Sequence, residues 1–247
     1  MKRILLISAL LLAVIFTVSA DRRRMLMTRN AAGAAGGNTV DNSRGYEVDS
    51  DPTGWSETDT GSQVARFSTS QANSGTHSME LLNTVVTVGY QTYDIGSAKS
   101  GLSMCTWVRT PSTGSDDICA IINLSTTGDP NDPCVRIYYQ NDAGSRYFRL
   151  RGTTFPVGAT SLSAATWYRL ELVMVGSSTS TLKIFDTGGS QVGSDITVTA
   201  VTANARYVLL GRSTATAGAT FSAMYFDDWG IDWTDSTSPL WSFTVAN

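Results

Sequence analysis

Arginine and tyrosine side chains recur at alternating positions of the segment 134–151, CVRIYYQNDAGSRYFRLR. The segment predicts a β-hairpin, because two runs of β-branched and aromatic residues flank the turn residues NDAG. Successive side chains of a strand point to opposite faces, so Val135, Ile137 and Tyr139 share one apolar face. The candidate ligand-contacting residues of the polar face are Arg136, Tyr138, Gln140, Tyr147, Arg149 and Arg151, to which Trp167 is added from a later strand.

These residue types suit the recognition of a sugar. Aromatic rings can cover its flat C–H faces, and arginine offers a rigid fork of donors to hydroxyls and carboxylates. If the turn is centred between residues 142 and 143, Arg136 lies opposite Arg149 and Tyr138 opposite Tyr147. Two arginines directly opposite each other repel unless an anion lies between them, so the pattern favours an acidic or sulfated glycan. A solvated face with cross-strand tyrosine packing is the alternative.

The elements that position these side chains are predicted to be short strands. From residue 39 onwards, short alternating runs are separated by Gly, Ser, Asn and Asp, and no helical period stands out. Many short strands at such spacing predict an all-β, two-sheet antiparallel sandwich. The candidate strands are 46–48, 64–68, 78–82, 85–93, 102–110, 118–124, 134–140, 146–151, 167–175, 181–185, 194–198, 207–211, 221–233 and 241–245.

Composition narrows the function classes. A chain of 247 residues is long enough for one large β domain. Its net charge of -3 argues against a nucleic-acid partner, because such proteins normally carry a basic patch.

The N-terminus predicts export. Lys2 and Arg3 precede the apolar run 4–18, and the small residues VSA at 18–20 form a cleavage site, so 1–20 is predicted to be a signal peptide. The run is shorter than the roughly 20 residues of a membrane span. A basic, Gly/Ala-rich linker follows at 21–38, and the sandwich domain occupies 39–247. Three arginines directly after the run resist export, so an uncleaved signal anchor stays open. The expected location is secreted, extracellular or cell-surface, without a stable membrane span.

The number of cysteines predicts one disulfide, because in an exported chain two of the three cysteines can pair and the third is left unpaired. The candidate strands 118–124 and 134–140 flank one loop, and antiparallel pairing centred there sets Cys119 opposite Cys134. We therefore expect a Cys119–Cys134 disulfide, with Cys105 free and buried.

Five motifs recur in a familiar order: GYE at 45–47, GW at 54–55, NSGTHSMEL at 73–81, ATWYRLEL at 165–172 and YFDDWGI at 225–231. Together they resemble the concanavalin A-like jelly rolls of the laminin-G-like and carbohydrate-binding-module group, over about residues 40–233. The resemblance implies a jelly-roll sandwich. The group contains lectins, non-catalytic modules, glycan hydrolases and lyases, and phage or adhesin surface domains, so it implies fold more strongly than activity.

The resemblance also implies a structural calcium ion. In the resembled modules, the positions of Glu47, the turn containing Thr76, and Asp227 or Asp228 converge on Ca²⁺, which takes about six to eight oxygen ligands. The alternative is that the two aspartates cap strand ends or face water.

Catalytic motifs of the resembled enzymes are incomplete. Glu47-Val48-Asp49 begins the Glu-x-Asp-x-x-Glu strand of retaining glycosidases, but no glutamate follows at the required position. The sole histidine, His77, matches neither the Gln-x-His motif of lyases nor a Ser–His–Asp set. The sequence therefore favours an exported, non-catalytic glycan-binding or surface-recognition module with a polysaccharide or glycoconjugate partner. A structural, self-assembling surface or phage-particle protein is the alternative, and a glycan-degrading enzyme ranks below both.

Overall fold

The computed structural model describes residues 42–44, 46, 54–59, 64–83, 88–115, 117–155, 160–176, 179–202, 204–213 and 220–234. All of them belong to one compact unit, Val40–Leu240 with Thr244–Asn247. The predicted signal peptide, the linker and the candidate strand 241–245 lie outside the described residues. Within the described part, no helix is long and apolar enough to cross a membrane.

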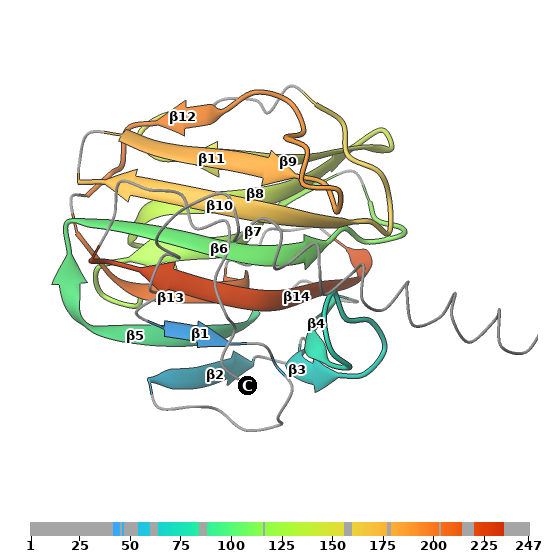
Figure 1. Cartoon of the computed structure of the whole chain (residues 1–247), viewed down its shortest axis with the longest axis horizontal. Coiled ribbons are helices and arrows are strands. Elements are labelled where there is room, and N and C mark those ends of the chain that lie inside the picture. The colour runs from blue at the N-terminus through green and yellow to red at the C-terminus, as the bar shows by residue number, and fades with distance from the viewer. Residues whose placement is uncertain are drawn as a thin grey trace, which may run out of the picture. The chain divides into compact units, whose positions relative to one another are not determined.

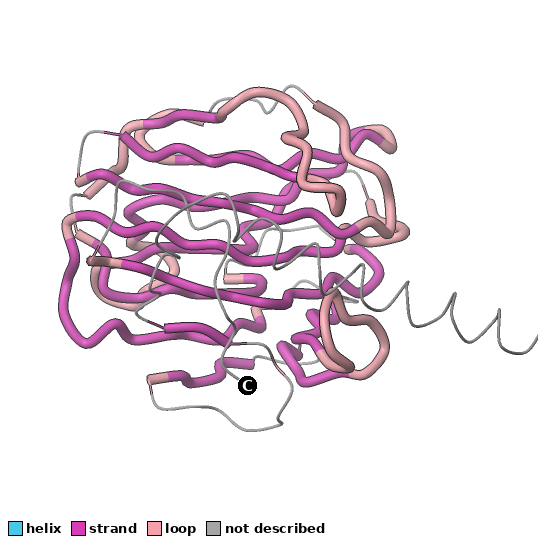
Figure 2. The backbone as a smooth tube through the Cα atoms, in the orientation of Figure 1, coloured by secondary structure: helices cyan, strands magenta, loops and turns pink. Residues whose placement is uncertain are grey.

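Strands make up the regular structure of the described residues, as Figure 2 shows. They are β1 (Asn42–Arg44), β2 (Trp55–Asp59), β3 (Val64–Ser68), β4 (Ser78–Asn83), β5 (Gly89–Lys99), β6 (Gly101–Arg109), β7 (Asp117–Ser125), β8 (Pro133–Asp142), β9 (Ser145–Arg151), β10 (Trp167–Val175), β11 (Thr179–Phe185), β12 (Ile196–Val198), β13 (Ala205–Arg212) and β14 (Phe221–Asp232).

Two antiparallel sheets contain these strands (Figure 1). The eight-stranded sheet has the order β12-β11-β10-β6-β14-β4-β3, and β1 also pairs with β14. The six-stranded sheet has the order β2-β5-β13-β7-β8-β9. This arrangement confirms the predicted all-β, two-sheet antiparallel jelly-roll sandwich.

The hydrophobic core takes alternate residues from both sheets. An aromatic cluster joins them: Trp229 of β14 packs edge-on against Trp55 of β2 and Tyr93 of β5, with ring centroids 4.9 and 5.1 Å apart. Gly54 precedes Trp55 with φ of +92°, and a Cβ there would lie 3.0 Å from the Tyr93 ring. The GW and DDWGI motifs are thus explained by packing.

The β8–β9 hairpin forms as predicted, but its register differs. Ala143 and Gly144 both have positive φ, 48° and 85°, and form the two-residue loop between Asp142 and Ser145. Two positive φ angles match the right-handed strand twist, which favours this loop. The turn is therefore centred one residue later than predicted, and Tyr138 lies opposite Arg149 instead of Tyr147. Arg136 likewise lies opposite Arg151 instead of Arg149, while the division into two faces is unchanged.

The predicted Cys119–Cys134 disulfide is absent, because the structure has all three cysteines free and buried. The β7–β8 pairing is centred on residue 129, with Leu124 opposite Val135 and Cys119 opposite Tyr139. Cys134 instead donates its thiol to the carbonyl of Asn204 at 3.0 Å. The assumption that the two cysteines lie opposite each other is therefore wrong.

Candidate functional site

Six of the seven predicted ligand-contacting residues lie together on β8 and β9. Their neighbours Val135, Ile137, Tyr139, Phe148 and Leu150 are in the core, so the alternating polar residues face outwards. The seventh, Trp167, begins β10 in the other sheet, where it lies opposite Arg109 of β6. The prediction that Trp167 joins the hairpin residues is therefore wrong, because the sequence does not say which sheet a strand enters.

We call the surface formed by Arg136, Tyr138, Arg149, Arg151 and Phe155 the hairpin face. Tyr138 lies on this outer side but is only 6% exposed. Its hydroxyl accepts hydrogen bonds from Nη1 of Arg136 at 3.1 Å and of Arg151 at 3.4 Å. The Phe155 ring packs edge-on against the Tyr138 ring at 5.1 Å. Tyr138 therefore supports the surface from below and is not the exposed stacking platform that the sequence predicted.

Phe155 is the exposed ring of the hairpin face, and the sequence prediction missed it. It follows the hairpin in a Gly/Thr-rich loop and is 37% exposed. The guanidinium carbons of Arg149 and Arg151 lie 5.2 and 5.9 Å from its ring centroid. The sequence feature that could have revealed it is an aromatic residue in a polar loop directly after a predicted binding strand.

The arginines of the hairpin face have no acidic partner among the residues that the structure describes. Arg136, which is 9% exposed, donates Nη2 to the carbonyl of Pro130. None of Arg136, Arg149 and Arg151 forms an ion pair with a described carboxylate. The Nε atoms of Arg136 and Arg149 are buried and have no hydrogen-bond acceptor among the described groups. Three neighbouring cations without a counter-charge can receive an anionic group.

A second surface covers the outside of β11, β10, β6 and β14. We call it the tryptophan face, and it consists of Trp107, Arg109, Trp167, Arg169, Phe185 and Tyr225. Two rows of side chains cross these strands. Trp167, Arg109 and Tyr225 are successive partners in the first row. Phe185, Arg169 and Trp107 are successive partners in the second.

Aromatic rings flank both arginines of the tryptophan face, and one carboxylate pairs with Arg169. Arg169 lies 4.7 Å from the Phe185 ring centroid and 5.9 Å from that of Trp107. Its Nη2 also lies 2.7 Å from Oε1 of the buried Glu171. Arg109 lies 5.9 Å from the ring centroid of Tyr225. The Arg169 guanidinium is thus held by two rings and a carboxylate, whereas that of Arg109 has one ring beside it.

The carboxylates beneath the tryptophan face are buried. Burial raises the pKa of Glu171 to about 7, and the neighbouring Arg169 opposes this shift. Glu80 of β4 accepts a hydrogen bond from the Tyr225 hydroxyl at 3.0 Å. Sequence reasoning singled out neither glutamate, because both occupy ordinary polar positions of alternating strands.

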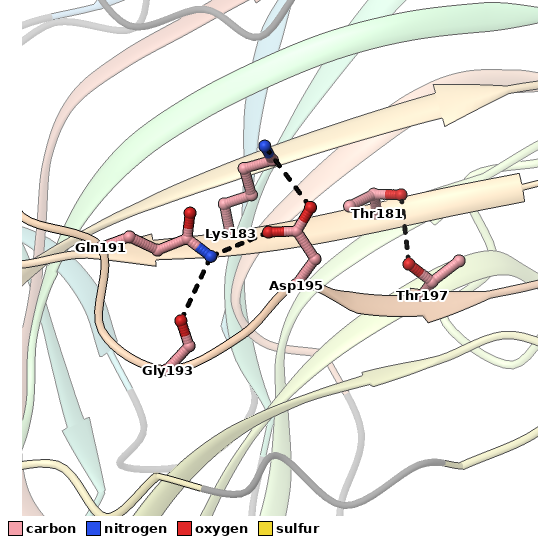
Figure 3. A network of polar contacts seen from close by, with 6 residues as sticks. All are labelled: Thr181, Lys183, Gln191, Gly193, Asp195 and Thr197. Carbon is pink, nitrogen blue, oxygen red and sulfur yellow. Dashed lines mark hydrogen bonds and ion pairs between the residues drawn. The ribbon is translucent and has the colours of Figure 1, made fainter.

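A polar network lies at the β11–β12 edge of the same sheet (Figure 3). Lys183, which lies opposite Glu171, has its Nζ 3.4 Å from Oδ2 of Asp195. Gln191 donates Nε2 to Oδ1 of Asp195 at 2.8 Å and to the carbonyl of Gly193 at 3.3 Å. The charges at this edge are therefore paired, in contrast to those of the hairpin face.

The predicted calcium ligands are brought together in part. Oδ2 of Asp227 accepts the backbone amides of Asn73 and Ser74, at 2.8 and 3.0 Å. Asp228 accepts from Nδ2 of Asn73 and from the Ser74 hydroxyl. Asn73 and Ser74, which precede the predicted ligand Thr76, thus bind the two aspartates.

The fit to a calcium ion is incomplete within the described residues. Glu47 lies outside them, and Thr76 bonds through its hydroxyl to Nδ1 of His77. The described residues contain no cluster of three His, Cys, Asp or Glu able to hold a metal. Burial and the neighbouring Asp228 raise the pKa of Asp227, so its ionised form is disfavoured by its surroundings. Both carboxylates suit calcium chemically, and the site stays a prediction.

Comparison with known proteins identifies the family. Residues 76–227 match the family model described as SO2946-like, C-terminal domain. The chain belongs to this family. The matched range runs from the β3–β4 turn to Asp227, and so contains both hairpin strands and all six residues of the tryptophan face of this SO2946-like domain. A search of curated protein sequences found no significant match.

Solved structures share the fold of the SO2946-like domain at low sequence identity. The cellulose induced protein Cip1 is 15% identical with a TM-score of 0.55, over 78% of this chain and 97% of Cip1. The carbohydrate esterase vb_24B_21 from Shiga toxin-encoding bacteriophage phi24B is 17% identical with a TM-score of 0.52, over 78% and 97% of the two chains. The botulinum neurotoxin serotype D binding domain is 11% identical with a TM-score of 0.50, and the match spans 79% of this chain and 48% of that domain. These likenesses support a jelly-roll fold, whereas the finer concanavalin A-like assignment stays a prediction.

Proposed function

We propose that this protein is a non-catalytic glycan-binding module whose hairpin face binds an acidic or sulfated glycan. The observation that carries the proposal is the cluster of Arg136, Arg149 and Arg151, which has no carboxylate partner among the described residues. Like charges at directly opposite strand positions repel, and an anionic group placed between them removes this cost. Export through the predicted signal peptide would bring the module to extracellular or cell-surface glycans.

The hairpin face offers a complementary group for each part of an acidic sugar. The exposed Phe155 ring can cover a C–H face, as aromatic platforms do for apolar surfaces. Arg149 and Arg151 flank this ring, so their donors can reach a carboxylate or sulfate on the same sugar. Tyr138 receives two arginine donors and thereby orients them before the ligand arrives. Such preorganisation lowers the entropic cost of binding.

The names of similar structures are compatible with this proposal. One is a carbohydrate esterase, one is a protein induced by cellulose and one is a toxin binding domain. At identities of 11–17% these names describe those proteins only. The proposal therefore depends on the hairpin face itself.

Calorimetric titration with a heparin-derived hexasaccharide and with hexagalacturonate tests the proposal. We expect Arg149→Gln and Arg151→Gln each to weaken binding about 10- to 100-fold, because a hydrogen bond to a charged group contributes about 1.5–3 kcal/mol. Arg206→Gln is the matched control: it removes the same charge from β13 of the same sheet, where Arg206 pairs with Asp94 at 2.8 Å. Affinity should also fall as salt rises. Failure of wild type to bind either anionic ligand, or equal binding by all three variants, would refute the proposal.

A further inference from the structure

The loop between β7 and β8 carries two negative charges beside the hairpin face. We call residues 126–132 the acidic loop. Asp129 and Asp132 are both exposed, and neither forms an ion pair with a described cation. Oδ1 of Asp129 accepts the backbone amide of Asn131 at 2.7 Å, and Oδ2 of Asp132 accepts the Thr127 hydroxyl at 3.3 Å. Within the described part of the chain, these two carboxylates therefore have neutral donors but no counter-charge.

Two side chains on the outer side of the six-stranded sheet attach the acidic loop to the hairpin face. Asn123 of β7 and Arg136 of β8 lie opposite each other. Both donate to the carbonyl of Pro130, Asn123 through Nδ2 at 3.1 Å and Arg136 through Nη2. Nη1 of the same guanidinium donates to the Tyr138 hydroxyl at 3.1 Å. A single guanidinium group therefore lies between the acidic loop and Tyr138.

The buried hydroxyl of Ser125 fixes the shape of the acidic loop. It accepts the backbone amides of Thr127 and Gly128 at 3.2 and 3.0 Å. It also lies 3.2 and 3.0 Å from the carbonyl oxygens of Asp129 and Asp132, which can accept its proton. The amide of Asp132 donates to the carbonyl of Asp129 at 3.1 Å. The backbone that carries both aspartates is thus ordered before a ligand arrives.

The strand register sets the order of the charges along the hairpin face. Counted from the β7–β8 loop, the first pair across β8 and β9 is Arg136 with Arg151, and the next pair on this face is Tyr138 with Arg149. An anion held between Arg149 and Arg151 therefore has the acidic loop as its neighbour, on the far side of the Arg136 guanidinium. Exposed charges act on each other over a Debye length of about 8 Å at physiological salt.

We propose that Asp129 and Asp132 determine the specificity of the hairpin face, by weakening the binding of glycans that carry a negative charge on every sugar. The inference deepens the proposed function and rests on it. The arginines attract one anionic sugar, and the acidic loop repels a second anion on the next sugar. An unpaired charge directed against the wrong ligand is a common source of specificity. The preferred ligand is therefore an acidic glycan whose charged sugars alternate with neutral ones.

A pair of ligands with the same backbone tests the proposal by calorimetry. In unsulfated chondroitin hexasaccharide the charged sugars alternate with neutral ones, whereas the 6-sulfated form carries a charge on every sugar. Wild type should bind the unsulfated form at least as tightly as the sulfated form. The double variant Asp129→Asn, Asp132→Asn should bind the sulfated form and the heparin-derived hexasaccharide at least threefold more tightly than wild type, with a smaller gain for the unsulfated form.

The asparagines keep the acceptors of the acidic loop, so the melting temperature should not change. Asp186→Asn is the matched control, because it removes the same charge from the turn after β11 in the other sheet. Oδ1 of Asp186 likewise accepts backbone amides, those of Gly188 and Ser190. This variant should keep every wild-type affinity. In about 1 M salt, where the Debye length is about 3 Å, the gain of the double variant should disappear.

The outcomes separate a failure of this inference from a failure of the hairpin site. The inference is refuted if the double variant binds the heparin-derived hexasaccharide as wild type does, or if both chondroitins gain equally. It is also refuted if neither chondroitin binds or if the gain persists in high salt. In each of these cases the hairpin face still stands, provided that the heparin-derived hexasaccharide binds. If no anionic ligand binds to wild type or to the double variant, both proposals fail.

Discussion

The outer faces of the two sheets use the same residue types but pair their charges differently. On the tryptophan face, Arg169 has Glu171 as a partner, and the adjoining Lys183 has Asp195. On the hairpin face, Arg149 and Arg151 meet an aromatic ring and a tyrosine hydroxyl instead of a described carboxylate. Arginine beside an aromatic residue therefore does not by itself define a ligand. A cluster of neighbouring arginines without a described counter-charge is what suits the hairpin face to an anion.

The two faces also differ in how far their aromatic rings are exposed. Tyr138, the predicted platform of the hairpin, is 6% exposed beneath Phe155. Trp107 and Trp167 are half-buried on the tryptophan face, where Tyr225 is 7% exposed. A side chain of a strand must point away from the core to contact a ligand. Whether it is exposed then depends on loops that fold back over the sheet, as the loop with Phe155 does over Tyr138.

The largest expected effect is a loss of stability on truncating a core side chain of the hairpin, compared with one on the hairpin face. Ile137 is 1% exposed in the core, whereas Phe155 is 37% exposed on the hairpin face. Ile137→Ala should lower the free energy of unfolding by about 2–5 kcal/mol, because it leaves a cavity in the packed core. Phe155→Ala should cost much less stability and reduce anionic glycan binding. Urea denaturation of both variants measures this, and a larger stability loss for Phe155→Ala would contradict the division into faces.

The next largest effect is a pH dependence of stability that arises from Glu171 beneath the tryptophan face. The pKa of Glu171 is raised from 4.5 to about 7 by burial, so the native state holds this proton more tightly than the unfolded state. Its favourable contribution is complete below pH of about 4.5 and is lost as pH rises to about 7, a change on the order of 3 kcal/mol. Asp227 acts in the same direction.

Urea midpoints measured between pH 4.5 and 8 check this expectation. Wild-type stability should fall as pH rises, and Glu171→Gln should flatten the slope, leaving the part due to Asp227. Arg149→Gln on the hairpin face is the control and should keep the wild-type slope. An unchanged slope in Glu171→Gln would show that this carboxyl does not titrate as inferred.

A bound calcium ion would add a smaller, ligand-dependent effect at the edge of the same sheet. If the predicted site binds Ca²⁺, a hundredfold excess over Kd raises the free energy of unfolding by about 2.7 kcal/mol. Thermal melting of chelator-treated protein, with and without millimolar calcium, checks the prediction. Asp228→Asn should reduce the shift, and no shift in wild type would exclude a stabilising site.

The smallest effect is expected at the hydroxyl of Tyr138. Tyr138→Phe keeps the ring but removes the acceptor of Arg136 and Arg151. We expect a loss of about 1 kcal/mol in stability, the usual net contribution of one hydrogen bond. Glycan affinity should also fall, because the two guanidinium groups lose their orientation. Chemical denaturation and calorimetry measure both, and unchanged affinity would show that Tyr138 does not position the arginines.

Local alternation made much of the fold predictable. β6, β8, β9 and β10 have clear period-two patterns, and the sequence placed them within a residue or two. β2 was missed because WSETD has few apolar residues and, among the described strands, β2 pairs with β5 alone. The predicted strand 85–93 is shifted to Gly89–Lys99 because its polar end is held by pairing with β13.

The candidate site was less predictable, because it depends on tertiary arrangement. The hairpin register follows from which two turn residues adopt positive φ, and several choices within NDAG were sterically open. The sheet that receives Trp167 is decided by pairing between strands far apart in the sequence. Phe155 lies in no strand, so the alternation that revealed the arginines could not reveal it.

The most direct measurement of the central claim is an NMR titration of wild-type protein with the heparin-derived hexasaccharide. We predict shifts of the guanidinium Nε–H signals of Arg149 and Arg151 and of the β9 backbone amides. The indole signals of Trp107 and Trp167 should stay in place. Saturating shifts confined to the tryptophan face, or none in β9, would contradict an anion-binding hairpin face.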